Sequence, residues 1–151
     1  MENLSLEEVK NKCHNRLMEV RTNEKDEHYY DSLNFFLDNG FYYEECWNLD
    51  ITLSALILPR LIQFKNTQVG YPPSFYNGSL LYSDNEEYKR KCEKEALKEW
   101  NDVLDKMIFA FKSIVYSDEE KCKTGGERKA LSEKIDLGLK LFGKYFRCLW
   151  D

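Results

Sequence analysis

Helical periodicity is the feature that most constrains this chain. Apolar residues recur every three or four positions in one segment after another, which places them on one face of an α-helix. The longest such segment runs from about Glu86 to Tyr116. Its second half carries a core face of Trp100, Val103, Leu104, Met107, Ile108, Phe111 and Val115. Only 7 Gly and 3 Pro occur in 151 residues, and strand signals are few, so we expect an all-α fold.

Four further segments have the same spacing. They cover residues 5–21, 26–39, 44–65 and about 127–149. Ser5 with Glu8, and Ser83 with Glu86, match the capping box that starts a helix. A chain of this length holds one core, so we predict a single helical domain over residues 1–151, a bundle of about five helices.

The one long connection, about residues 66–82, is rich in aromatic residues. Gly70, Pro72 and Pro73 are turn signals within it. Its rings are Tyr71, Phe75, Tyr76 and Tyr82. Loops of this length are uncommon unless they are functional or mobile, which makes these rings candidates for binding.

The segment 44–65 is the most apolar element. A helix that is apolar nearly all round is expected to be buried on most sides. One wide face consists of Trp47, Leu49, Leu53, Leu56, Ile57, Leu61 and Phe64. Pro59 removes a backbone donor, so we expect a kink near residues 55–59 or two shorter helices.

Residues 38–43 allow two interpretations. Gly40 can take a left-handed conformation that ends a helix, with Phe41 packing back on it. Asn39-Gly40 is also a strong hairpin signal. We favour the helix end, because the flanking residues do not alternate between apolar and polar.

Charge and cysteine content narrow the setting. The net charge of −5 disfavours binding to duplex nucleic acid. Five widely spaced cysteines do not resemble a disulfide framework, and we expect Cys46 and Cys148 to be small core residues. The N-terminal residues do not resemble a signal peptide. The longest apolar stretch, residues 51–58, is far shorter than the roughly 20 residues that cross a bilayer, so we expect a cytoplasmic protein without a membrane partner.

Motifs for catalysis are absent from the sequence. It contains no phosphate-binding glycine loop and no nucleophile elbow. Cys13, His14 and His28 lack the spacing of a zinc site. Thr124 to Glu127 opens a helix and either binds an anion at its backbone N–H groups or is a capped flexible break, which we favour. We therefore expect no enzyme activity, no cofactor and no metal.

Asp50 is the one carboxylate that stands out, because the most apolar stretch follows it. If it is buried, it needs a partner or a raised pKa. Arg60 lies about 15 Å further along the same helix, so Lys106 or Arg147 would have to be that partner. The favoured interpretation is a structural ion pair, and the alternative is a general acid or base in a pocket.

Aromatic and basic residues supply the remaining candidates. Aromatic residues make up 15 % of the chain, and roughly half of them fall on predicted core faces. Rings and cations together can hold a protein partner or stack a nucleotide base beside a bound phosphate. The candidate binding residues are Trp47, Asp50, Arg60, Tyr71, Tyr76, Lys106, Tyr145, Arg147 and Trp150.

Several sequence blocks resemble a family of small proteins encoded by tailed phages and prophages. The blocks are Trp47-Asn48-Leu49-Asp50, Leu58-Pro59-Arg60-Leu61, Gly70-Tyr71-Pro72, Val103 to Ile108, and Leu141 to Trp150. The resemblance covers about residues 36–151, with residues 75–95 resembling an insertion. It implies the cytoplasm of an infected bacterium, and the family brings no assigned activity.

Three functions follow as hypotheses. The first is a non-enzymatic binding protein that antagonises a host protein, such as an anti-phage defence factor. The second is a protein that sequesters a signalling nucleotide. The third is a small helical enzyme that uses Asp50 with an arginine. The sequence also permits a homodimer.

Overall fold

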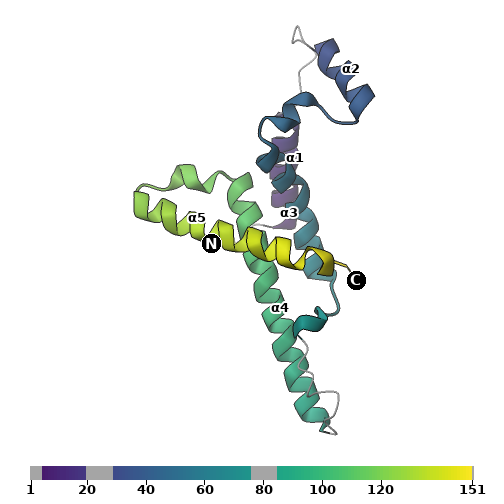
Figure 1. Ribbon diagram of the computed structural model, residues 1–151, viewed down its shortest axis with the longest axis vertical. Helices are drawn as coiled ribbons and strands as arrows, with labels where there is room; N and C mark the ends of the chain where they lie inside the picture. The colour runs from purple at the N-terminus through teal and green to yellow at the C-terminus, as the bar shows by residue number, and fades with distance from the viewer. Residues whose placement is uncertain (1–4, 20–28, 76–84, 151) are drawn as a thin grey trace. The chain divides into compact units, whose positions relative to one another are not determined.

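The computed structural model describes residues 5–19, 29–75 and 85–150, and this part of the chain is all-α, as predicted (Figure 1). It contains five α-helices and no strand. The α-helices are α1 (Leu6–Glu19), α2 (Tyr29–Asn39), α3 (Leu49–Thr67), α4 (Glu86–Val115) and α5 (Gly125–Tyr145). The 3₁₀ turns include η1 (Tyr43–Cys46), η2 (Pro73–Phe75), η4 (Asp118–Lys121) and η5 (Phe146–Cys148). None of the described helices is long and apolar enough to cross a membrane.

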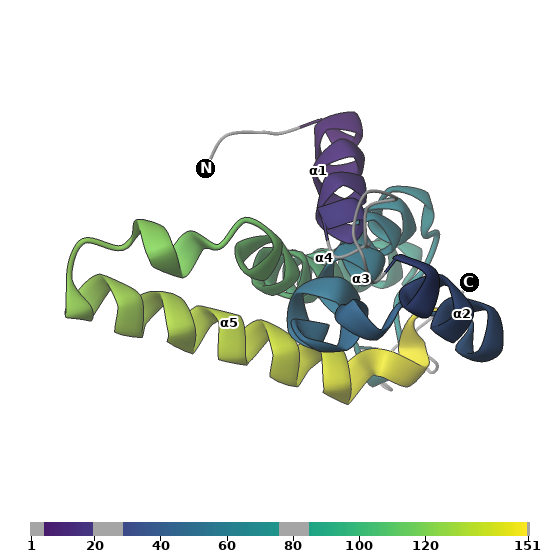
Figure 2. The same cartoon turned by 90° about the horizontal axis from the view of Figure 1, so that it is seen from above.

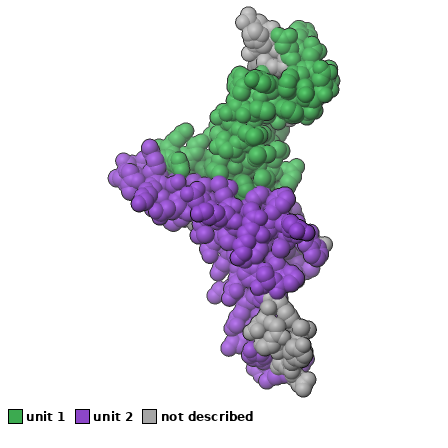
Figure 3. All heavy atoms as spheres, in the orientation of Figure 1, with its two compact units in different colours: residues 1–60, 111–121 green, residues 61–110, 122–151 purple. Residues whose placement is uncertain are grey.

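Contacts divide the chain into two compact units (Figure 3). Unit 1 comprises residues 1–60 and 111–121, and unit 2 comprises residues 61–110 and 122–151. One boundary falls inside α3 and another inside α4. The single domain over residues 1–151 stays a prediction.

Side chains at the starts of the helices confirm two of the expected caps. At α1, the Glu8 carboxylate accepts from the Ser5 N–H at 2.6 Å, and the Glu8 N–H donates to Ser5 Oγ. The hydrogen bonds from Ser5 lower the pKa of Glu8. At α5, Thr124 and Glu127 form the same reciprocal box, so the helix begins at Gly125. Ser83 lies outside the described residues, and at α4 Asn85 Oδ1 accepts from the Tyr88 N–H at 3.0 Å.

The end of α2 settles the choice at residues 38–43 in favour of a helix end. Gly40 has a φ of +81°, and its N–H donates to the Phe36 carbonyl at 2.7 Å. This is the left-handed capping arrangement that favours glycine. The Phe41 ring packs edge-on against Phe35, with centroids 5.5 Å apart. The hairpin alternative is therefore wrong.

Helix α3 differs from the sequence prediction in three respects. It begins at Leu49, because residues 43–46 form the 3₁₀ turn η1. It is one helix through Pro59, so the alternative of two shorter helices is wrong and the kink stays a prediction. Its leucines at 49, 53 and 56 are exposed, so burial on most sides is wrong. The buried side consists of Thr52, Ser54, Ala55, Leu58 and Leu61.

Three of the five buried residues of α3 are small. Thr52, Ser54 and Ala55 are small, so this side of α3 can lie close to neighbouring backbone in a densely packed interior. The hydroxyl of buried Thr52 donates to the Glu45 carbonyl at 3.1 Å, which satisfies its polar group. Leu58 and Leu61 are buried with these small residues, whereas Leu49, Leu53 and Leu56 are exposed.

The core of unit 1 also contains residues of α1 and of the last part of α4. Val9 and Cys13 of α1 are buried, as are Phe111 and Val115 of α4. Arg16 donates through Nε to the Val115 carbonyl at 3.2 Å and through Nη2 to Ser117 Oγ at 2.9 Å. A carbonyl at the end of a helix lacks an intrahelical partner, so Arg16 caps the C-terminus of α4.

Unit 2 is organised around Trp100, which is buried in α4. The rings of Phe75 and Tyr145 lie 5.6 and 5.5 Å from it, and 5.4 Å from each other. The Trp100 indole N–H donates to Gln68 Oε1. These contacts join Gln68 and the 3₁₀ turn η2 to α4 and α5.

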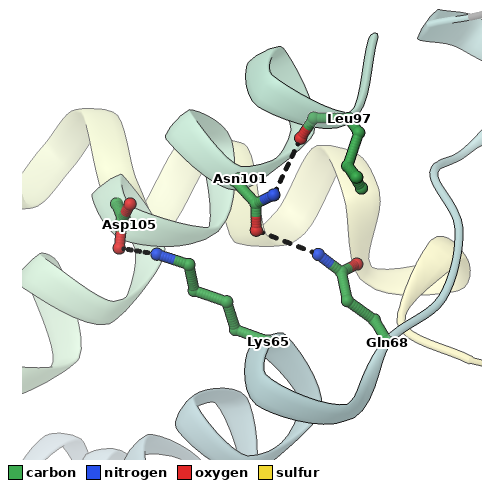
Figure 4. A network of polar contacts seen from close by, with 5 residues as sticks. All are labelled: Lys65, Gln68, Leu97, Asn101 and Asp105. Atoms are coloured by element: carbon green, nitrogen blue, oxygen red, sulfur yellow. Dashed lines mark hydrogen bonds and ion pairs between the residues drawn. The ribbon is translucent and has the colours of Figure 1, made fainter. Parts of the chain in front are cut away.

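Polar contacts fix the end of α3 and the residues after it against α4 (Figure 4). The Gln68 amide donates to Asn101 Oδ1 at 3.1 Å, and Asn101 donates to the Leu97 carbonyl at 2.9 Å. Lys65 forms an ion pair with Asp105 one turn further along α4. The Gln68–Asn101 and Lys65–Asp105 pairs are partly exposed, so each adds little to the free energy of unfolding. They mainly set the position of residues 65–68 along α4.

Helix α5 lies across the unit 2 part of α4 as one unbroken helix (Figure 2). A Cβ added at Gly138 would lie 2.3 Å from the Lys106 carbonyl oxygen and 2.5 Å from Ala110 Cβ. This close approach determines which side of α5 is buried. Ile135, Gly138 and Tyr145 face inward, whereas Phe146, expected in the core, is exposed.

Gly138→Ala is expected to destabilise the protein by about 1–3 kcal/mol, because the methyl group forces α4 and α5 apart. Gly143→Ala is the matched control on the same helix, since nothing lies within 4 Å of its added Cβ. We expect the control to be neutral or to stabilise by up to about 1 kcal/mol. Urea unfolding measures both, and equal free energies of unfolding for the two variants would contradict the close crossing.

Candidate binding surface

Exposed large apolar side chains concentrate in one part of unit 1. Of 15 such side chains among the described residues, eight lie between residues 30 and 56. They are Tyr30, Leu37, Phe41, Tyr43, Trp47, Leu49, Leu53 and Leu56. Single exposed apolar residues are ordinary, but a concentration of them is typical of an interaction surface.

Four rings form the first part of this surface, here named the aromatic row. Phe41 contacts Phe35, Phe35 contacts Tyr43, and Tyr43 contacts Trp47, with centroids 5.5, 5.7 and 6.0 Å apart and all edge-to-face. The turn at Gly40 returns the chain onto α2, where Tyr42 stacks on Phe36 at 4.8 Å. Tyr43 is 54 % exposed and Trp47 is 68 % exposed, so the row ends in solvent.

The second part is the leucine stripe, which consists of Leu49, Leu53 and Leu56 on α3. Spacings of four and three residues place these side chains on the same side of the helix. They are 49, 46 and 37 % exposed. The stripe begins two residues after the last ring of the aromatic row.

Asp50 does not occupy the buried position that the sequence suggested. It is exposed in the first turn of α3. Arg60, also exposed, donates from its guanidinium to the Leu56 carbonyl of its own helix. Lys106 and Arg147 are exposed residues of unit 2. The expectation of a buried carboxylate is therefore wrong.

Unit 2 brings together two of the predicted candidates, Tyr71 and Trp150. Together with Gln68, Trp100 and Cys148 they line a hollow of about 260 Å³ whose described lining contains no charged side chain. Its volume is just below the range of about 300–1,000 Å³ that is usual for ligand pockets. Tyr76 lies outside the described residues.

Tyr145, another candidate, is buried rather than available to a partner. Its ring packs against Trp100 and Phe75, and the Lys144 ammonium lies 4.7 Å from its centroid. Tyr145 therefore belongs to the core of unit 2.

The loop before α5 behaves as a capped break. Glu127 Oε2 accepts from the backbone N–H groups of Lys123 and Thr124, at 2.8 and 3.1 Å. An internal carboxylate thus takes two of the donors that an anion would need. In the part of the chain that the structure describes, no group of three or more His, Cys, Asp or Glu side chains is placed to hold a metal ion.

Sequence reasoning missed the leucine stripe of this surface. Leu53 and Leu56 were assigned to the core, and so was Cys46, which is exposed, while Cys148 is half-buried. The available signal was the run of small residues at Thr52, Ser54 and Ala55, all of which are buried. Of the predicted residues, Trp47 lies on the surface as a candidate for binding.

Comparisons with protein-family models, with curated proteins and with solved structures yield no significant match for this chain. The function is therefore inferred from the chemistry of the surface itself.

Thiol reactivity tests where this surface lies. Cys46 is exposed beside Trp47, whereas Cys13 is buried and burial raises its pKa. Because the thiolate is the reacting form, we expect iodoacetamide to modify Cys46 at least about tenfold faster than Cys13 in the native protein. Peptide mass spectrometry after timed labelling measures both rates, with urea-unfolded protein as the control. Comparable native rates would contradict the assigned burial.

Proposed function

We propose that this protein is a non-enzymatic binding protein that docks a host protein through the aromatic row and the leucine stripe of unit 1. The single observation that supports this proposal is the exposure of Trp47, Tyr43 and three leucines in one short segment. Buried Trp and Tyr side chains dominate the energetics of protein interfaces. Exposed in the free protein, they favour association because burying them removes apolar surface from water.

The resemblance to small phage proteins supports a bacterial setting for the partner. The Trp47-Asn48-Leu49-Asp50 block of that resemblance joins the end of the aromatic row to the start of the leucine stripe. In this proposal the protein acts in the cytoplasm of an infected bacterium and blocks a host factor of anti-phage defence.

The nucleotide alternative draws on the hollow in unit 2. Tyr71, Trp100 and Trp150 offer rings for stacking a base, but the described lining offers no cation to a phosphate. A rise in Tm with cyclic or linear nucleotides that Trp150→Ala removes would favour it. The enzyme alternative required a buried carboxylate at Asp50, and Asp50 is exposed.

Trp47→Ala/Leu53→Ala tests the proposal without disturbing a packed core, since both side chains are exposed. The matched control is Trp150→Ala/Leu139→Ala, which removes an exposed Trp and an exposed Leu from unit 2. Capture from bacterial lysate with quantitative mass spectrometry identifies the partner, and the purified pair then gives the Kd. We expect the first variant to weaken binding at least about 30-fold and the control to leave it unchanged.

Two results would contradict the proposal. One is a partner that binds the Trp47→Ala/Leu53→Ala variant as tightly as the wild type. The other is a partner lost only in the unit 2 control, which would move the binding site to the hollow.

A further inference from the structure

The net negative charge of this protein arises in the same segment as many of its exposed apolar residues. Residues 29–59 contain five carboxylates and no Lys, Arg or His. The net charge of the chain is −5, from 27 acidic and 22 basic residues, so the remaining sequence is balanced at 22 of each. The five carboxylates are Asp31, Asp38, Glu44, Glu45 and Asp50.

Asp38 and Asp50 are exposed, and Asp50 lies at the edge of the leucine stripe. Asp50 follows Leu49 directly, and helical geometry places it about 60° around α3 from Leu53, at the edge of the leucine stripe. Asp38 lies in the last turn of α2, shortly before the Gly40 turn that leads into the aromatic row. Charges at the edge of an apolar helix seam select the partner and its orientation.

We infer that the partner segment is a basic amphipathic helix, with apolar side chains on the leucine stripe and Trp47, and with Lys or Arg beside Asp38 and Asp50. This inference rests on the proposed binding function and names the chemistry of its partner. The four- and three-residue spacing of Leu49, Leu53 and Leu56 is the spacing by which one helix packs along another. A basic helix meets the charge of the segment, and opposite charges also accelerate the encounter.

The negative charge of residues 29–59 argues against two other kinds of partner. Nucleic acid and anionic membranes carry the same sign as this segment. A second copy of the chain is tested separately, because Arg60, exposed four residues after Leu56, would offer an antiparallel copy a cation for Asp50. A basic helix is complementary to both the apolar stripe and its acidic edge.

Three synthetic helical peptides separate the contributions of charge and of apolar contact to binding. The first has leucines on one face and lysines elsewhere, the second replaces lysine by glutamate, and the third keeps lysine but replaces leucine by glutamine. Binding is followed in a Trp150→Phe background by the fluorescence of exposed Trp47, since Trp100 is buried. Protection of Cys46 from alkylation is an independent readout on the same segment.

We expect only the leucine–lysine peptide to bind, and to bind more weakly as salt is raised. Asp38→Asn/Asp50→Asn is expected to weaken this binding about fivefold to tenfold. The matched control, Glu133→Gln/Asp136→Asn, removes two exposed carboxylates from α5 and is expected to leave the affinity unchanged. Trp47→Ala/Leu53→Ala is expected to abolish it.

Equal binding of the leucine–glutamate peptide, or of the peptide without leucine, would overturn the inference. So would an unchanged affinity in Asp38→Asn/Asp50→Asn, or a dimer in light scattering that Leu53→Ala dissociates. If no peptide binds while capture of a host protein still requires Trp47 and Leu53, the basic helix is wrong and the proposed function stands. If capture does not require these residues, the proposed function itself fails.

Discussion

Helix α3 carries more apolar side chains than one packed side can cover, and the rest of the structure depends on which side is buried. Thr52, Ala55 and Leu58 face inward, where small residues permit close packing. The leucines at 49, 53 and 56 are then left in solvent together, next to Trp47. The candidate binding surface is thus a consequence of how α3 packs.

Local sequence signals predicted the helices well because their causes are local. The Ser5–Glu8 and Thr124–Glu127 caps, the left-handed Gly40, and the buried Trp100, Leu104 and Met107 of α4 all follow from spacing and residue type. The buried sides of α3 and α5 were predicted less well, because they depend on the neighbouring helix. Gly138 packs against α4, and on this packing Tyr145 is buried and Phe146 is exposed. The apolar spacing of α5 alone does not determine which of these two rings is buried.

How each helix packs against its neighbour also decides which of the predicted candidate residues are exposed and which are buried. Asp50 stands out in the sequence because apolar residues surround it, yet Trp47, Leu49 and Leu53 around it are themselves exposed. The aromatic excess divides in a similar way. The rings of Trp100, Phe75 and Tyr145 hold unit 2 together, while the aromatic row of unit 1 ends at exposed Trp47. The aromatic row also differs from the rings of unit 2 in its charge, because residues 29–59 around it contain carboxylates and no Lys, Arg or His.

The orientation of α3 is tested most directly by two single substitutions on its opposite sides. Leu58 is fully buried and Leu53 is 46 % exposed. Leu58→Ala should lower the free energy of unfolding by about 2–5 kcal/mol. Leu53→Ala should change it by no more than about 0.5 kcal/mol. A loss at Leu53 as large as that at Leu58 would mean that the leucine stripe is part of the core and not a binding surface.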